Sequence, residues 1–469
     1  METATEESHR DAPSPLRREL DFKDIFFLSL GGQAPFLSML TYVTAVFTFS
    51  GSFSPIVMVV ATGIVFVNGV VVYKLSTKYS SAGGYYTYAV HSLSKTLGLE
   101  TGWIYLFYSV LYGAAYVAGS AFIVNFVLGV PTWIAISIPL IPSTIFLVMG
   151  VKPSTRYAIV AAAMELAVLV GIAIFALKLA NFAFYVPDHP PTSPMLWLAI
   201  LFGTGVPTGY GSITPVSGEV KNAKRTVGKA ALAVILTGGL LMSLDAYGIA
   251  DVAMRTGSLS SILASKIPIF EVLGRVLGPL TIPLLLFVAI NDGVLATLAF
   301  MTASSRTMFA MGWDRTLPSF LGKVNGNKPL NAILVTIMVF AAVVVPSAFL
   351  LGPYGAFLAL GAAAGLGGLT VHLSANFSLL RISTKRIEKR KVEMAVALAA
   401  VAVTAVTLGF SLTSTERVLA DTFLGWVIGG FLYGETLRMR RKEEIKGEGG
   451  EIRRTNVSRN KNLGSKQRL

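Results

Sequence analysis

The chain has 469 residues, of which 53% are hydrophobic and only 14% are charged. Apolar runs of about 20 residues, the length that spans a bilayer as a helix, recur along most of the chain and predict an all-α integral membrane protein rather than a soluble domain. The net charge of +14 comes from basic residues that flank apolar runs, which argues against nucleic-acid binding, and the absence of cysteine excludes disulfides and thiolate metal sites.

Twelve apolar segments are long enough to be transmembrane helices. They cover approximately residues 24–50, 54–73, 102–128, 133–150, 158–180, 195–216, 230–254, 277–302, 330–350, 356–380, 392–411 and 418–437. Two aromatic, semi-polar stretches, 83–94 and 301–323, are predicted to be helices at the membrane surface. Residues 1–22 lack the apolar stretch of a signal peptide, and the basic residues 438–469 lack apolar periodicity and are predicted to be disordered.

The distribution of basic residues predicts the orientation of these spans. If the N-terminus is cytoplasmic, all but five of the 39 Lys and Arg residues fall on the cytoplasmic side of the membrane. The five exceptions are Lys178, Arg255, Lys266, Arg275 and Arg417. Because segments rich in Lys and Arg stay in the cytoplasm, we expect a multi-pass protein of the cell membrane with both termini inside.

The first span is interrupted by residues 29–35, whose sequence is SLGGQAP. An interior glycine costs a helix about 1 kcal/mol and a proline about 3 kcal/mol relative to alanine, so the helix is predicted to break here. Inside a bilayer, freed backbone groups are tolerated only where they are buried in protein or line a cavity. The N–H groups at the start of the second half-helix carry partial positive charge and suit a carboxylate.

The sixth span has a matching interruption at residues 203–211, which contain four glycines and Pro207. Spans one to five and six to ten form two sets of five, and because five is an odd number the second set is inverted relative to the first. Interrupted helices at corresponding positions of two inverted halves point to a transporter binding site, where backbone carbonyls suit an ammonium or a metal cation. The alternative is a kinked or closely packed helix, since Gly and Pro are common in membrane helices.

Three segments of the chain carry a resemblance to a known family. They are residues 81–106, SAGGYYTYAVHSLSKTLGLETGWIYL, residues 202–231, which include GEVKNAKRTVGKAA, and residues 304–334, SSRTMFAMGWDRTLPSFLGKVNGNKPLNAIL. They resemble, in this order, the entry into the third span, the exit from the sixth span and the cytoplasmic segment after the eighth span of amino acid permeases of the amino acid–polyamine–organocation superfamily.

This resemblance implies a five-plus-five inverted-repeat core over residues 23–384, with helices eleven and twelve (385–437) outside it and cytoplasmic tails at 1–22 and 438–469. It also implies alternating access to a substrate held between spans one, three, six, eight and ten. The backbone expected to meet the substrate carboxylate is that of Gly31, Gly32, Gln33, Ala34 and Pro35. The backbone expected to meet its amino group is that of Thr204, Gly205, Thr208 and Gly209. Family members often carry a bulky gate near Gly205 or Gly211, so we expect an unusually open pocket here.

Several polar side chains within the spans are candidates for substrate binding. Tyr108, Tyr112 and Tyr116 share one face of the third span at a spacing of four, as a cavity wall or as a packing stripe. Asn291 and Asp292 are adjacent in the middle of the eighth span. Because neighbours on a helix point about 100° apart, one of them is expected to face the cavity. Tyr112 and Asn291 are therefore predicted substrate contacts.

Two carboxyl groups are candidates for proton coupling. Glu165 lies midway along the fifth span, at a depth where an ionisable residue is expensive and is a functional candidate by default. Such a group is able to load and release a proton, and the alternative is a structural hydrogen bond. Asp292 is predicted to carry a proton or to recognise a cationic group, against the alternative of interhelical hydrogen bonding.

The sequence therefore predicts a secondary active transporter that moves amino acids by proton-coupled symport or by exchange. Sodium coupling through hydroxyls such as Thr297 is a second possibility. Polyamines, nucleobases or other organic cations are the alternative substrates. No catalytic constellation stands out within the spans, and the two helix breaks differ from each other, so an intramembrane enzyme and a channel are both disfavoured. No metal or cofactor is predicted, and the partners are a small-molecule substrate and the lipid bilayer, without nucleic acid.

Overall fold

A computed structural model describes residues 16–182, 185–187, 189–255, 269–270, 273–274, 278, 281–385 and 390–440. The first 15 residues and the predicted tail beyond residue 440 lie outside the described residues, as do parts of the segment before the predicted eighth span. Within the described part the chain is helical, and its β-type pairings are two isolated bridges, Leu20 with Val220 and Asn325 with Lys328.

The helices follow one another in a simple order along the chain. Their bounds are α2 (Phe22–Gln33), α3 (Pro35–Ser38), η1 (Met39–Val43), α4 (Thr44–Ser50), η2 (Gly51–Phe53), α5 (Ser54–Ser76), α6 (Tyr85–Ser92), α7 (Lys95–Leu128), α8 (Thr132–Met149), α9 (Val151–Leu179), α10 (Ser193–Gly205), η3 (Val206–Ser212), η4 (Pro215–Glu219), α11 (Ala223–Arg255), α14 (Ile282–Trp313), η6 (Ser319–Gly322), α15 (Leu330–Thr384) and α16 (Lys391–Ser414). A last helix covers residues 417–440.

Nine helical segments among the described residues are long and apolar enough to cross a membrane. Two of them, Phe22–Ser76 and Leu330–Thr384, have 55 residues each, far more than the roughly 20 that one crossing needs. Each is bent at a glycine with positive φ, Gly51 at 52° and Gly352 at 70°, a backbone conformation that other residues rarely adopt. Both bends fall between two spans that were predicted separately from the sequence.

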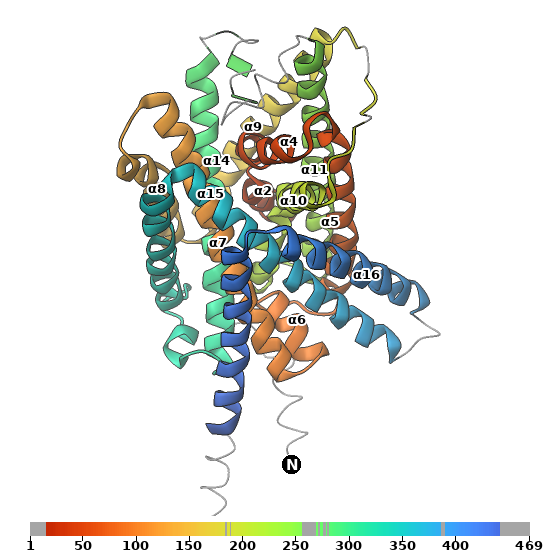
Figure 1. The fold of residues 1–469 in the computed structure, drawn as a ribbon. Helices are drawn as coiled ribbons and strands as arrows, with labels where there is room; N and C mark the ends of the chain where they lie inside the picture. Colours follow the sequence, from red (N-terminus) through yellow and green to blue (C-terminus); the bar gives the residue numbers. More distant parts are fainter. Residues whose placement is uncertain are drawn as a thin grey trace, which may run out of the picture.

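The interrupted helices lie near the middle of the molecule, as Figure 1 shows for α2, α4 and α10. The long helix α7 packs against α14 and α15 beside them, and α5 packs against α11. Helix α16 lies towards one side (Figure 1), where it contacts α15, α10 and α5. The last helix joins α7 through the stacked rings of Trp103 and Trp426, whose centroids are 4.7 Å apart.

Of the two predicted surface helices, the first is observed as a helix, with its place at the membrane surface still a prediction, and the second is wrong. Helix α6 is a separate short helix within 83–94. The stretch from 301 instead continues α14 without interruption as far as Trp313. Its polar side chains suggested the membrane surface, but they are buried in protein: Ser304 bonds the hydroxyl of Ser109, and Arg306 pairs with Glu219.

Candidate substrate and coupling site

The first helix breaks at the predicted place. Helix α2 ends at Gln33, and Ala34 adopts a left-handed conformation with φ of 41° and ψ of 65°. The chain becomes helical again at Pro35 and stays so through α3, η1 and α4 to Ser50. Proline suits a first helical position because it has no N–H group to leave unpaired, so the break separates two half-helices cleanly.

Two buried carboxyl groups cap the start of the second half-helix. The backbone N–H of Phe36 donates to Glu165 Oε1 at 2.7 Å, and that of Leu37 donates to Asp292 Oδ2 at 2.8 Å. Glu165 comes from α9 and Asp292 from α14, and both side chains have 0% exposure. Negative charge is favourable at a helix N-terminus, so two helices distant in sequence jointly hold this end of the break.

The remaining carboxyl oxygens are left open. Glu165 Oε2 and Asp292 Oδ1 accept no hydrogen bond from any described residue. The two carboxyl groups accept from the backbone N–H groups of adjacent residues, Phe36 and Leu37, so they lie beside each other. Two like charges on neighbouring groups oppose each other, and a single proton relieves the repulsion. The pair is therefore a natural place to hold one proton.

Gln33 links the first break to the second. Its side-chain amide donates to the carbonyl of Pro207 at 3.0 Å and to that of Val234 at 3.2 Å. Its own backbone carbonyl accepts from the hydroxyls of Ser38 at 2.6 Å and Tyr116 at 2.8 Å. The side-chain N–H groups and the backbone carbonyl of Gln33 are thus bonded within the protein, whereas its Oε1 atom has no hydrogen-bond partner among the described residues.

The second break is held by close packing. Helix α10 ends at Gly205 and is followed by the two 3-10 segments η3 and η4. A Cβ atom on Gly209 would lie 2.3 Å from the backbone N of Gln33 and 2.4 Å from the carbonyl oxygen of Ser29. Backbone atoms of a neighbouring helix cannot give way as a flexible side chain does, so this position requires glycine. The two breaks lie directly against each other.

A small pocket adjoins the second break, between α5, α7, the α10–η3 junction and α15. Four predicted site residues line it: Thr204, Gly205, Thr208 and Tyr112. It has space for little more than one water molecule. The pocket lining does not include the other predicted residues, which are Gly31, Gly32, Gln33, Ala34, Pro35, Gly209, Asn291, Glu165 and Asp292.

The expected openness near Gly205 and Gly211 is wrong. A Cβ on Gly205 would lie 2.8 Å from the ring of Tyr42, and one on Gly211 would lie 2.9 Å from the hydroxyl of Tyr108. Tyrosines from other helices therefore fill the room that these glycines leave. Sequence spacing along the sixth span alone does not reveal what packs against it.

The tyrosines of α7 connect the pocket to the first break. Tyr112 lines the pocket and donates its hydroxyl hydrogen bond to the carbonyl of Gly205. Its hydroxyl is 3.1 Å from that of Tyr116, which reaches Gln33. The spacing of four along α7 thus places one tyrosine at each break, with the two hydroxyl oxygens close together.

Asn291 and Asp292 point to different neighbours. The side-chain oxygen of Asn291 accepts a hydrogen bond from the hydroxyl of Tyr157 on α9, whereas Asp292 meets the start of the second half-helix. Neither residue lines the pocket. The two side chains diverge, but the expectation that one of them faces the cavity stays a prediction, as does the role of Asn291 as a substrate contact.

Two polar residues of the pocket were not among the predicted contacts. Asn68 on α5 accepts hydrogen bonds from Asn376 at 2.8 Å and from Thr404 at 3.0 Å. His372 on α15 lies with a ring nitrogen 3.0 Å from the hydroxyl of Tyr210. Asn68 interrupts an otherwise apolar run in the sequence, which is the signal that could have identified it.

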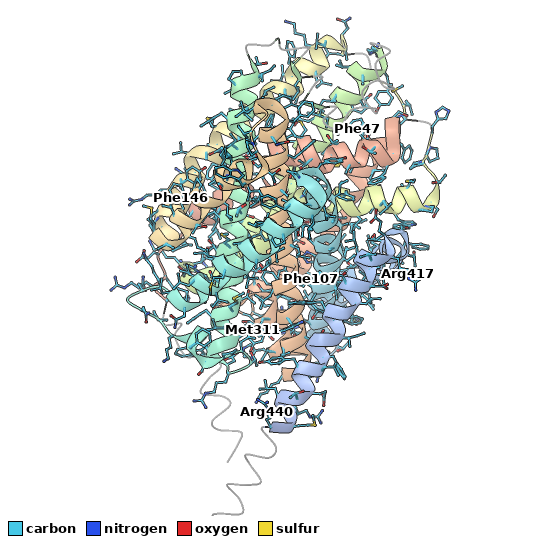
Figure 2. All side chains as sticks on the ribbon, turned by 60° about the vertical axis from the view of Figure 1, so that its left-hand side comes forward. Phe47, Phe107, Phe146, Met311, Arg417 and Arg440 are labelled. Atoms are coloured by element: carbon cyan, nitrogen blue, oxygen red, sulfur yellow. The ribbon has the colours of Figure 1, made fainter. Side chains whose placement is uncertain are left out.

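A buried ion pair closes one end of the molecule. Arg306 Nε lies 2.7 Å from Glu219 Oε1, and these side chains are 2% and 5% exposed. The backbone N–H of Leu20 also donates to the carbonyl of Glu219 at 3.0 Å. In Figure 2, Met311, five residues beyond Arg306 on α14, lies toward the lower end of the molecule, whereas Phe47 lies toward the upper end. The ion pair therefore joins three segments on the side that the charge distribution predicts to be cytoplasmic.

Comparison with known proteins assigns a family to this arrangement. The model of the family described as amino acid permease matches residues 24–421. The branched-chain amino acid permease BcaP of Lactococcus lactis subsp. cremoris (strain MG1363) is 26% identical over 197 residues, which cover 39% of this chain and 40% of BcaP. The low-affinity putrescine importer PlaP of Escherichia coli (strain K12) is 26% identical over 290 residues, which cover 58% of this chain and 62% of PlaP.

The matched regions thus span less than two thirds of the length of either relative. The family model, by contrast, covers most of the chain, including both helix breaks, the capping carboxyl groups and the pocket. This chain belongs to the amino acid permease family.

Proposed function

We propose that the protein is a secondary active transporter of small amine-bearing solutes, the class that includes amino acids and polyamines. It crosses the cell membrane twelve times with both termini in the cytoplasm, and its first ten helices form two inverted sets of five. The family membership supports transport, and the bends at Gly51 and Gly352 support two additional crossings. Helix 417–440 is the twelfth span.

A proton-coupled mechanism is supported by one observation. The carboxyl groups of Glu165 and Asp292 both accept hydrogen bonds at the break in the first helix. A proton held between the two carboxyl groups neutralises like charges in a site shielded from water. Loss of that proton leaves two negative charges against the start of the half-helix and changes how tightly it is held. Proton loading is in this way linked to the conformation of the helix that moves in alternating access.

The small size of the pocket and the buried Glu219–Arg306 ion pair support an occluded resting arrangement. Removal of one partner of a buried ion pair leaves an uncompensated charge and typically costs 3–5 kcal/mol. Opening toward the cytoplasm therefore requires both partners to be exposed to water together. We propose that this ion pair holds the cytoplasmic side of the transporter closed. The backbone N–H of Leu20, in the N-terminal segment, donates a hydrogen bond to the carbonyl of Glu219 beside it.

Uptake into proteoliposomes tests the proposed function. Radiolabelled amino acids and polyamines are supplied under an inward proton gradient, an inward sodium gradient, and no gradient. Accumulation driven by protons is the expected result. Accumulation driven only by sodium would contradict proton coupling and direct attention to hydroxyls such as Thr297, and uptake only into preloaded vesicles would indicate an exchanger.

A conservative variant identifies the coupling group. Glu165→Gln keeps the shape of the side chain and an oxygen that accepts from Phe36, but it cannot carry a proton on a carboxyl group. We expect proton-driven accumulation to be lost and exchange between preloaded substrate and external substrate to persist. Asp245→Asn is the matched control, because it removes another buried carboxyl group, on α11. Unchanged proton-driven uptake in Glu165→Gln would remove Glu165 from the mechanism.

A further inference from the structure

The backbone N–H groups at the start of the second half-helix are already used in hydrogen bonds, so few remain to bind a carboxylate ligand. An amino acid substrate would use its exposed N–H groups, but those of Phe36 and Leu37 already donate to Glu165 and Asp292. Pro35 has no N–H group, and the Ala34 N–H bonds the carbonyl of Gly31 at 3.1 Å. The protein's own carboxyl groups thus occupy the place that a substrate carboxylate would take.

The open oxygens of the same two residues add a second obstacle. Glu165 Oε2 and Asp292 Oδ1 are buried and accept no hydrogen bond from the described residues. A substrate carboxylate brought beside them would meet negative charge or bare oxygen atoms, whereas an ammonium group brings three donors and a positive charge. The local field therefore favours a cation over an anion.

The pocket lining has the same preference. Its described residues include neither lysine nor arginine, the side chains that bind carboxylates most strongly. It does include the rings of Tyr108 and Tyr112, and the hydroxyl of Tyr108 has no hydrogen-bond partner among the described residues. Aromatic faces attract ammonium groups, and a phenolic oxygen accepts hydrogen bonds from them.

We infer that this transporter selects organic amines without a carboxylate group, mono- or diamines, over the corresponding amino acids. The inference rests on the proposed transport function and narrows its substrate class. A hydrogen bond to a charged group corresponds to a factor of roughly 10 to 100 in affinity. An amino acid that must displace Glu165 or Asp292 from a backbone N–H loses at least one such bond, so its amine counterpart binds about 10 to 100 times more tightly.

Matched pairs that differ by a single carboxylate test this selectivity. The pairs are putrescine with ornithine, agmatine with arginine, and isoamylamine with leucine. Uptake and competition are measured in proteoliposomes, and binding is measured separately as the shift in unfolding temperature of the purified protein. The amine is expected to compete about 10 to 100 times better than its partner in at least one pair. Equal or better performance of the amino acid in every pair overturns the inference.

The two measurements separate failure of selectivity from failure of transport. If neither member of any pair is transported, the proposed function fails, and stabilisation by amines but not by amino acids would still support the inference. If neither member is transported and none stabilises the protein, both are overturned. Transport of amino acids with no amine transport overturns the selectivity alone.

A variant shows whether the capping group causes the selectivity. Glu165→Ala frees the N–H of Phe36, so the preference for an amine over its amino acid in the binding measurement is expected to fall by about 10-fold. Asp245→Asn, which removes a carboxyl group away from the helix break, is expected to keep the full preference. An unchanged preference in a folded Glu165→Ala protein would show that the carboxyl group does not exclude the amino acid.

Discussion

The two helix breaks lie against each other but are held by different means. At the first, carboxyl groups from α9 and α14 accept hydrogen bonds from the backbone of Phe36 and Leu37. At the second, the backbone is held by contact, with Gly209 pressed against Gln33 and Ser29. The first break depends on carboxyl groups, whereas the second depends on close packing at a glycine together with neutral hydrogen bonds from Gln33 and Tyr112.

This difference suggests that the two breaks have different roles in the site. A hydrogen bond to a carboxyl group changes its strength when a proton arrives or leaves, whereas a contact between packed backbones does not. The first break is therefore suited to sensing a proton, and the second is suited to forming a fixed wall beside the small pocket. Gln33 joins the two breaks through its hydrogen bond to the carbonyl of Pro207.

The largest expected effect is on transport, and it comes from a substitution that alters only the first break. Asp292→Asn retains an oxygen for the N–H of Leu37 but leaves Glu165 without a carboxyl partner. We expect proton-driven accumulation to fall to the level seen without a gradient, because a proton can no longer be shared between two acids. The measurement is uptake into proteoliposomes under an inward proton gradient, with Asp245→Asn as the control. Full accumulation by Asp292→Asn would mean that the first break does not respond to protons.

The second effect is on folding and concerns the packed break. Gly209→Ala places a methyl group against backbone atoms at 2.3 and 2.4 Å and is expected to destabilise the protein by about 3 kcal/mol. Thermal unfolding of the purified protein in detergent measures the loss. Gly171→Ala is the matched control, since nothing lies within 4 Å of its Cβ position. Equal stability of the two variants would show that the breaks are not in close contact.

Both breaks were located by sequence because their cause is local. Glycine and proline destabilise a membrane helix wherever they occur, and SLGGQAP and the 203–211 segment concentrate them. The free-energy cost of placing the carboxyl groups of Glu165 and Asp292 within apolar spans can also be recognised from the local sequence, so both were identified as functional candidates. The sequence resemblance also identified the family, which the match over residues 24–421 confirms.

The partners of those acids could not be predicted in the same way. Phe36 and Leu37 take part through backbone N–H groups, so their apolar side chains give no signal. The contact exists because α9 and α14 bring side chains from residues 165 and 292 to one helix end, which is a tertiary arrangement. The surface helix predicted over 301–323 is wrong for a related reason, since the partners of Ser304 and Arg306 lie on other segments.

The third effect tests the link between the breaks. Gln33→Leu removes two buried side-chain hydrogen bonds, to the carbonyls of Pro207 and Val234, which is expected to cost about 2 kcal/mol. Thermal unfolding again measures the change. Thr62→Val, which removes only a 3.4 Å hydrogen bond to the carbonyl of Gly239 on the same helix α11, is the control. A loss no larger than that of Thr62→Val would mean that the breaks are not joined through Gln33.

The smallest effect concerns the tyrosine of α7 at the first break. Tyr116→Phe removes one donor to the carbonyl of Gln33, but the hydroxyl of Ser38 still donates to it. We expect a loss of about 1 kcal/mol in the same unfolding measurement. A loss as large as that of Gly209→Ala would show that the tyrosine, rather than the capping acids, holds the first break together.

The proton role of Glu165 and Asp292 is tested most directly by recording proton and substrate movement together. Proteoliposomes containing a trapped pH-sensitive dye receive external putrescine or ornithine without an imposed gradient, and internal pH and radiolabel uptake are followed in parallel. We predict that substrate entry acidifies the interior in the wild-type protein and that this acidification is absent in Glu165→Gln. Substrate entry in the wild-type protein without a change of internal pH, or equal acidification by the variant, would contradict the account.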